Sequence, residues 1–197
     1  MPKIDAATVA EHRAARRAAL LDAAADLLRE DPSKAPSLAA AGARAGLSRS
    51  SVYHYFESSE AMIAALVEET FPRWQRRFDE AIGSASTPAE RVLAYVHENL
   101  RLVADGENAL ARALSTAAPS HDLADRSMAF HAALTAPLAA ALGELGVANV
   151  DFTAELVNSL VLTGARQLEA GAAIDEVEAG IQAVLRPFLA NHDAGLA

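Results

Sequence analysis

The stretch GLSRSSVYHYF, residues 46–56, holds two of the chain's three tyrosines together with an arginine, a histidine and three serines. On a helix, at roughly 100° per residue, Val52 and Phe56 share one side, while Ser50, Ser51 and His54 fall on the opposite side. The tyrosines then flank a narrow polar stripe. Such a stripe places hydrogen-bonding groups against base edges, while hydroxyls at its margins bond phosphates. These residues therefore favour reading of the DNA major groove.

Three short helices are predicted to position this stretch. A helix over 14–29 ends at the prolines of DPSKAPS. A supporting helix over 37–45 follows, and a turn through Gly46 leads into a recognition helix over 48–56. The serine that opens each of the last two helices is the expected N-cap. This order of helix, tight turn and helix predicts a helix-turn-helix.

The composition indicates a folded globular protein. Its 197 residues are 52% hydrophobic and include no cysteine, which excludes disulfides and thiolate chemistry and suits a reducing compartment. The longest stretch without Asp, Glu, Lys or Arg, residues 127–143, is shorter than the roughly 20 apolar residues that span a bilayer. The N-terminus lacks the pattern of a secretory signal. We expect a cytoplasmic protein with no membrane partner.

Charge is distributed unevenly along the chain. Residues 1–56 hold eight Lys/Arg and six Asp/Glu, a net charge of +2, while residues 57–197 hold nine and twenty, a net charge of −11, which together give −9. A mildly basic N-terminal segment followed by an acidic remainder is consistent with phosphate contacts restricted to the N-terminal segment. This asymmetry alone is equally explained by differently solvated surfaces.

The remainder of the chain also predicts helices, because strand signals are almost absent and apolar residues recur at helical spacing. An apolar line predicts a helix from Ser59 to about residue 82, which Pro72 must kink or interrupt. Thr87-Pro88-Ala89-Glu90 combines a capping box with proline at the first helical position and starts a helix to about Val103. Further helices are expected near 107–117, 122–145, 152–170 and 174–190, with fraying ends at about 1–10 and 191–197. The predicted fold class is all-α with about nine helices.

The segment SLAAAGARAGLSRSSVYHYF, residues 37–56, has a specific pattern: a capped short helix, an alanine-glycine-aliphatic-serine turn, and a helix ending in tyrosine, any residue, tyrosine or phenylalanine, and phenylalanine. With the run SEAMIAAL that follows, it resembles the DNA-binding domain of the TetR (tetracycline repressor-like) transcription regulators. The motif covers about 37–66, and the helix count agrees less specifically elsewhere. The resemblance implies a helix-turn-helix DNA-binding domain at 1–57 and a helical effector-binding and dimerisation domain at 58–197.

The function that the resemblance implies is that of a homodimeric, ligand-responsive transcription regulator. We expect a repressor that releases a palindromic double-stranded DNA operator when a small-molecule effector, whose identity the sequence does not give, binds the C-terminal domain. The effector is expected to shift the helix that starts at Ser59, hinged near Pro72, and to change the separation of the two recognition helices.

DNA contacts carry over to nine positions that match the family pattern. Arg49, Ser50 and His54 are expected to face the groove, with Arg49 as a bidentate guanine contact. The tyrosines are expected either to contact phosphate or to pack under the recognition helix, and the serines to bond phosphate, to cap their helices, or both. The nine residues are Ser37, Arg44, Ser48, Arg49, Ser50, Ser51, Tyr53, His54 and Tyr55.

The sequence departs from the family pattern in two places. Ala41 and Gly42 stand where the family usually carries isoleucine and alanine, so the supporting helix is expected to be looser or packed differently. Ser59 replaces a lysine usual after the recognition helix, which removes a phosphate contact. Three arginines near the N-terminus offer compensating charge: Arg13, Arg16 and Arg17.

For the C-terminal domain, the resemblance implies an effector site and a four-helix dimer interface. Taken singly, each candidate effector residue is better explained as a core or surface residue, and the apolar seams of the last two helices fit an intramolecular core equally well. Dimerisation also follows from function, because one recognition helix reads few base pairs. The effector candidates are Trp74, Phe78, Tyr95, Asn99, Met128, His131, Asn158 and Thr163. The interface candidates are Phe152, Leu156, Leu160, Ile174, Val177, Ile181, Leu185 and Phe188.

Two other classes of protein stay open. The first is an enzyme that uses His97, His121 or His131, but the sequence holds no metal-ligand spacing, nucleophile–base pair or phosphate loop, so we expect no catalytic residue, metal site or cofactor. The second is a dimeric helical ligand-binding protein that has lost specific DNA recognition, which the departures at 41–42 and 59 keep open.

Overall fold

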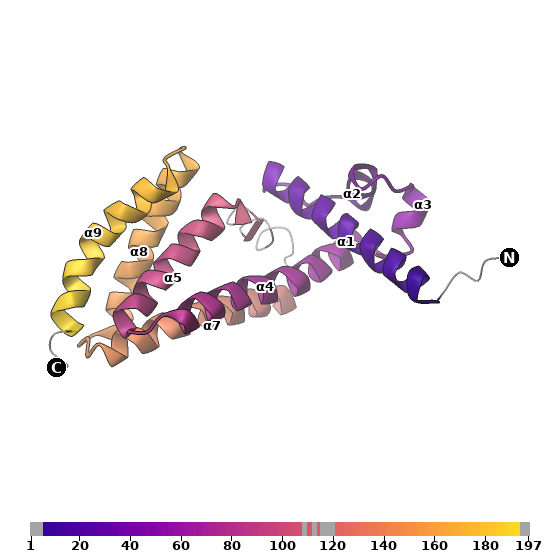
Figure 1. Ribbon diagram of the computed structural model, residues 1–197. Coiled ribbons are helices and arrows are strands. Elements are labelled where there is room, and N and C mark those ends of the chain that lie inside the picture. The colour runs from indigo at the N-terminus through magenta and orange to yellow at the C-terminus, as the bar shows by residue number, and fades with distance from the viewer. Residues whose placement is uncertain (1–5, 108–109, 112–113, 115–120, 194–197) are drawn as a thin grey trace. The chain divides into compact units, whose positions relative to one another are not determined.

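The computed structural model of the protein describes residues 6–107, 110, 111, 114 and 121–193 (Figure 1). Every regular element among these residues is an α-helix, as the sequence predicts. The helices are α1 (Ala6–Glu30), α2 (Leu38–Arg44), α3 (Arg49–Val52), α4 (Ser59–Ser84), α5 (Pro88–Ala104), α7 (His121–Glu144), α8 (Val150–Glu169) and α9 (Ile174–Asp193). None of these helices is long and apolar enough to cross a bilayer. The helix predicted near 107–117 lies partly outside the described residues.

Packing divides the chain into two units. The first unit holds residues up to Thr70 together with 109–124, and the second unit holds 71–108 and the chain from residue 125. The border falls inside α4, whose first turns bury Met62 and Ile63 within the first unit. The functional domain boundary at 57, which follows the extent of the helix-turn-helix, stays a prediction.

α1 supplies an extensive buried face in the first unit, with Leu20, Ala24 and Leu28 fully buried. The helix begins at Ala6, well before the predicted start at residue 14. Its first turns are exposed as far as they are described. Alanine, glutamate and arginine extend a helix without needing burial, so periodicity alone underestimated its length.

Both predicted serine caps are formed. Ser37 Oγ accepts the N–H of Ala40 at 3.1 Å at the start of α2. Ser48 Oγ accepts the N–H of Ser51 at 3.3 Å at the start of the recognition segment, residues 48–56. Each bond satisfies a backbone donor that the first helical turn leaves unpaired.

The turn between α2 and α3 depends on a left-handed residue, which Gly46 supplies with φ +67°. The N–H of Gly46 donates to the carbonyl of Ala43 at 3.3 Å, and the N–H of Leu47 donates to the carbonyl of Gly42 at 2.8 Å. This pair of bonds closes the end of α2 and reverses the chain within a few residues. The predicted helix-turn-helix connection is confirmed.

The recognition segment contains a shorter regular helix than the sequence predicts. α3 ends at Val52, and the chain continues as tight turns: His54 N–H donates to Ser51 O at 3.1 Å, and Tyr55 N–H donates to Val52 O at 2.9 Å. β-branched and aromatic side chains lose freedom in a regular helix, which favours tighter turns here. The predicted inward side is nevertheless correct, because Val52 and Phe56 are 0% and 6% exposed.

Gly42 allows α2 and α3 to approach closely. A Cβ added at Gly42 would lie 2.4 Å from Cγ2 of Val52 and 3.5 Å from the backbone oxygen of Leu47. The neighbouring Ala41 is fully buried. The volume missing from the Ala41-Gly42 pair is therefore occupied by Val52, so the supporting helix is packed differently rather than loosened at this point.

α4 is one continuous helix with Pro72 inside it, so of the two predicted effects of this proline the interruption is wrong, and a kink stays a prediction. Proline cannot donate to the carbonyl one turn earlier. The predicted apolar line nevertheless continues past it, since Trp74 and Phe78 are buried as Ile63 is. Burial on both sides of the proline offsets the missing hydrogen bond.

In the second unit, α5, α8 and α9 lie side by side (Figure 1). The predicted capping box opens α5: Thr87 Oγ1 accepts the N–H of Glu90, and Glu90 Oε2 accepts the N–H of Thr87, both at 3.1 Å. A Cβ added at Gly164 of α8 would lie 2.7 Å from Leu100 and 2.9 Å from Ile181. The three helices therefore pack together at Gly164, where α8 has no side chain.

We predict that Gly42→Ala lowers the free energy of unfolding by about 1–3 kcal/mol, because the stiff side chain of Val52 cannot move away from the new methyl group. Thermal unfolding measures the loss. Gly83→Ala in α4, where nothing lies within 4 Å of the new Cβ, is the matched control and should be neutral or stabilising by up to about 1 kcal/mol. Combining Gly42→Ala with Val52→Ala should cost less than the sum of the two; strict additivity would contradict the contact.

Candidate nucleic-acid interface

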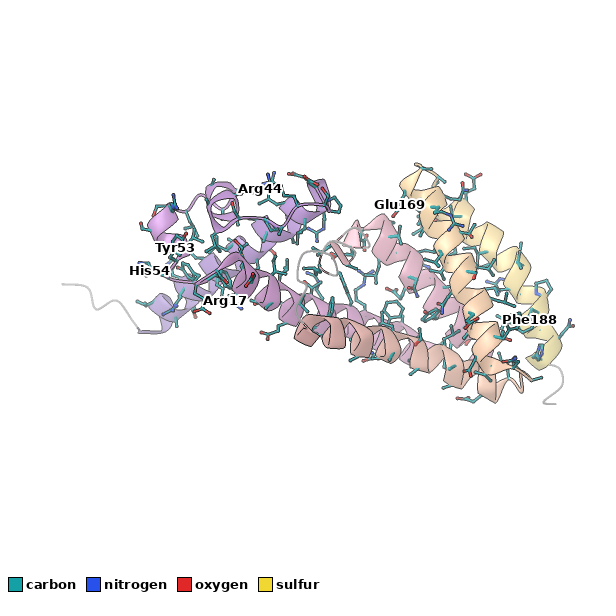
Figure 2. All side chains as sticks on the ribbon, turned by 180° about the vertical axis from the view of Figure 1, so that it is seen from behind. Arg17, Arg44, Tyr53, His54, Glu169 and Phe188 are labelled. Atoms are coloured by element: carbon teal, nitrogen blue, oxygen red, sulfur yellow. The ribbon has the colours of Figure 1, made fainter. Side chains whose placement is uncertain are left out.

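The recognition segment exposes most of the side chains predicted to contact DNA. Arg49, Ser50, Tyr53 and His54 are exposed, and the Tyr53 residue keeps 52% of its surface. Tyr55 is half-buried, which agrees with packing beneath the segment. Figure 2 labels Tyr53 and His54 on this segment of the first unit. A guanidinium, a hydroxyl and an imidazole are thus presented together to solvent.

The hydroxyl groups of Ser48, Ser50 and Ser51 form one cluster. Ser48 Oγ lies 3.1 Å from Ser50 Oγ and 2.8 Å from Ser51 Oγ. Three hydroxyls sharing two hydrogen bonds leave one O–H to donate to an acceptor outside the cluster. Ser37, at the start of α2, is also exposed while its Oγ caps the helix. Capping and anion contact are therefore compatible at these serines.

Arg44, the remaining predicted contact, is engaged by a carboxylate. Its Nη2 lies 2.7 and 2.9 Å from the two carboxylate oxygens of Glu30, at the end of α1. The hydrogen bond to Glu30 raises the pKa of Arg44 above its ordinary value. Both side chains are exposed enough for the pair to exchange partners, so a phosphate must compete with Glu30 for this guanidinium.

Arg17 is a contact residue whose role the sequence did not reveal. Arg13 and Arg16 are exposed, in keeping with their predicted role as added positive charge, but Arg17 is half-buried. It pairs with Glu69 of α4, and its guanidinium carbon lies 5.5 Å from the ring centroid of Phe56. Its partners stand far along the chain, and no local sequence signal identifies such a contact.

In the second unit, the structure brings part of the predicted effector set together. The O–H of Tyr95 donates to Oδ1 of Asn158 at 2.7 Å, and Nδ2 of Asn99 donates to the backbone carbonyl of Tyr95 at 2.8 Å. The rings of Phe78 and Tyr95 lie 5.8 Å apart, and Trp74 is also buried. These residues form an aromatic cluster with two amide side chains at its edge.

Of the three remaining effector candidates, Thr163 alone has a described side chain. Thr163 is exposed, and its hydroxyl donates to the backbone carbonyl of Ser159 within α8 at 2.9 Å, because threonine one turn along a helix readily makes this bond. Met128 and His131 lie on α7, but their side chains are outside the described residues.

The interface candidates on α8 and α9 divide between the surface and the core of the second unit. Phe152 and Leu156 keep 55% and 50% of their surface, whereas Ile181 and Leu185 are buried. The two buried residues therefore follow the intramolecular interpretation of the seam, because the chain itself covers them. The half-buried candidates are Leu160, Ile174, Val177 and Phe188, of which Figure 2 labels Phe188.

Of the three histidines of the enzyme hypothesis, His97 alone has a described side chain. Nδ1 of His97 lies 3.0 Å from Oε2 of Glu178, which joins α5 to α9. The side chains of His121 and His131 are outside the described residues. Among the side chains that are described, no three histidine or carboxylate groups converge as metal ligands would.

Comparison with known proteins identifies the N-terminal part. The family model of bacterial regulatory proteins of the tetR family matches residues 20–66, from α1 into α4. An HTH-type transcriptional regulator of Mycobacterium tuberculosis is 34% identical over 126 residues, a match that covers 63% of this chain and 61% of the relative. The chain thus matches about three fifths of that relative's length.

Solved structures share the fold. FadR of Bacillus subtilis, in complex with stearoyl-CoA, superimposes with a TM-score of 0.66 at 16% identity over 84% of this chain and 95% of that chain. The TetR-family regulator PfmR of Thermus thermophilus gives a TM-score of 0.69 at 20% identity over 85% and 94%. The protein is therefore an all-α helix-turn-helix protein. Its residues 20–66 match the model of the tetR family of bacterial regulatory proteins, and the relatives that it matches are described as transcriptional regulators.

We predict that Glu30→Gln strengthens DNA binding by about twofold to fivefold, because it releases Arg44 for phosphate. Fluorescence anisotropy with labelled DNA measures the change. Asp22→Asn, which removes the same charge from an exposed position of α1, is the matched control for long-range electrostatics. An equal gain from Glu30→Gln in an Arg44→Ala background would contradict the competition.

We predict that Tyr95→Phe lowers the free energy of unfolding by about 1–2 kcal/mol, because Asn158 loses its hydrogen-bond donor. Burial raises the pKa of Tyr95 from 10.0 to about 12. A group whose pKa is higher in the folded state than in the unfolded state contributes its full stability below the unfolded-state pKa. That contribution is lost as the pH rises through the folded-state pKa. Unfolding measured from pH 9 to about 12 should therefore show wild type losing its advantage over Tyr95→Phe above pH 10; a constant difference would contradict the burial of an ionisable hydroxyl.

Proposed function

We propose that the protein is a homodimeric, ligand-responsive transcription regulator that represses by occupying a palindromic DNA operator. The observation that carries this proposal is the exposed set of Arg49, Ser50 and His54 on a helix-turn-helix whose inward side is fixed by Val52 and Phe56. A repressor needs a rigid scaffold that presents polar side chains at the width of the major groove.

The proposed DNA contacts are of two kinds, contacts to bases and contacts to phosphates. Arg49 reads guanine through paired N–H groups, and Ser50 and His54 add hydrogen bonds to neighbouring base edges. Hydroxyls around them bond phosphates and fix the register without reading sequence. We assign the phosphate contacts to Ser37, Arg44, Ser48, Ser51 and Tyr53, and the half-buried Tyr55 to packing beneath the segment.

A second copy of the chain completes the regulator. One recognition segment covers too few base pairs to select an operator, and a two-fold dimer doubles its contacts on a palindromic site. The exposed side chains of Phe152 and Leu156 on α8 support this pairing, as does Val184 of α9, which belongs to the same unit and is 60% exposed. The half-buried Leu160 and Phe188 extend the apolar surface.

The effector is an apolar small molecule that binds among the helices of the second unit. The aromatic cluster of Trp74, Phe78 and Tyr95, edged by the amides of Asn99 and Asn158, supports an aliphatic or aromatic ligand with few polar groups. The structurally similar FadR was solved with stearoyl-CoA, a molecule with a long acyl chain. Binding shifts α4 near Pro72 and weakens simultaneous engagement of both half-sites.

A helical protein that dimerises and binds a ligand without reading DNA is less well supported. The departures at Ala41-Gly42 and Ser59 were its sequence arguments. Because the side chain of Val52 occupies the space beside Gly42, the first departure accompanies a well-packed helix-turn-helix. Ser59, at the start of α4, remains the one departure that costs a phosphate contact.

We predict that the protein binds one specific fragment from a pool that includes DNA upstream of its own gene, and that Arg49→Ala weakens this binding about tenfold to 100-fold. Fluorescence anisotropy at two salt concentrations, with unlabelled competitor DNA, measures affinity and selectivity. Arg76→Ala, at an exposed position of α4 in the second unit, is the matched control and should bind as wild type. Weak binding to every fragment alike would overturn sequence-specific regulation.

A further inference from the structure

Arg17 of α1 joins two other segments of the first unit. Nη1 of Arg17 donates a hydrogen bond to Oε1 of Glu69 on α4. The central carbon of the same guanidinium lies 5.5 Å from the ring centroid of Phe56. The side chains of Arg17 and Glu69 keep 38% and 48% of their surface. One guanidinium therefore touches the end of the recognition segment and α4 at once.

Phe56 anchors the C-terminal end of the recognition segment. It is 6% exposed, and its N–H donates to the carbonyl of Val52 at 3.1 Å. Tyr53 and His54 stand between these two inward residues and are exposed. A displacement of the Phe56 backbone from its buried position would therefore also move the end of the segment that carries Tyr53 and His54.

A guanidinium is the only cationic side chain suited to both contacts. Its plane can cover an aromatic face while N–H groups at its edge donate to a carboxylate. A lysine ammonium is a point charge that cannot cover a ring and hold a directional carboxylate contact in the same way. Arg17 also stands next to the buried face of α1, since Leu20 and Leu21 are buried one turn later.

We propose that Arg17 is a positioning residue that holds the recognition segment against α4, so that operator affinity depends on Arg17 and Glu69 although neither touches DNA. The inference rests on the proposed function, because it concerns how that function's DNA-reading segment is oriented. It differs from the sequence interpretation, in which Arg17 adds positive charge for phosphates. Arg13 and Arg16, both exposed, fit that simpler role.

Glu69→Gln separates the two interpretations by sign. Removing a negative charge strengthens attraction to DNA in general. If Arg17 needs Glu69 to position the segment, the same change instead weakens operator affinity, by about threefold to tenfold given the strengths of exposed ion pairs and cation–π contacts. Glu60→Gln, on the exposed first turn of α4, is the matched control and should bind as wild type or more tightly.

Arg17→Lys and Arg17→Met complete the test. Both should weaken operator affinity to a similar extent, while the slope of log affinity against log salt stays at the wild-type value, because no phosphate contact is lost. Thermal unfolding of each variant is measured in parallel, and variants whose melting temperature matches wild type isolate positioning from folding. Retention of affinity in Arg17→Lys with a reduced salt slope in Arg17→Met would assign Arg17 to phosphate and overturn the proposal.

The proposal and the proposed function fail in different ways. Wild-type protein that selects no DNA fragment would remove the function itself. Wild-type protein that selects a fragment, with Glu69→Gln binding as tightly as Glu60→Gln, would leave the function intact and overturn the role of Arg17 alone.

Discussion

The close approach of α2 and α3 at Gly42 is the contact on which the geometry of the first unit depends. The side chain of Val52 occupies the space that any larger residue at position 42 would fill, and its β-branched form leaves few alternative positions. The carbonyl of Gly42 also accepts the N–H of Leu47 to close the turn. One residue thus sets both the turn and the packing, and with Val52 inward the polar side chains of the recognition segment face solvent.

Polar contacts play different roles in the two units. Ion pairs of the first unit, such as Arg44 with Glu30, are exposed and contribute little to stability, but they decide which charges are available to a partner. In the second unit, Tyr95 donates to Asn158 between α5 and α8 from a buried position. Because an unsatisfied buried group is costly, that bond favours one register of the two helices.

The sequence predicted what local chemistry determines. The caps at Ser37 and Ser48, the left-handed turn at Gly46 and the capping box of α5 all follow from short spacings, and all are formed. Contacts between distant residues were not predictable in this way. The volume beside Gly42 has meaning only once Val52 is seen to fill it.

The same limit explains the other differences. Pro72 predicted a kink or an interruption because proline is unfavourable inside a helix. The buried side chains on either side of it, which favour a continuous helix, are apparent only in the structure. The seam of α9 was ambiguous because helical periodicity reports that a face is apolar, not which surface covers it. Only the packed chain shows that Ile181 and Leu185 of this seam are buried, whereas Phe152 and Leu156 of the α8 seam are exposed.

The exposed apolar residues of α8 and α9 bear on the proposed dimer. Fully burying a large apolar side chain contributes about 1.5–3 kcal/mol, so the exposed Phe152, Leu156 and Val184 represent a substantial driving force for association. A partner that covers them must itself be apolar, and a second copy presents the same surface by symmetry. In the proposed dimer, pairing also joins two recognition segments into one DNA-binding particle. Because the contacts of both segments would then act together on one DNA molecule, we expect operator affinity to depend on their separation as well as on the side chains that they carry.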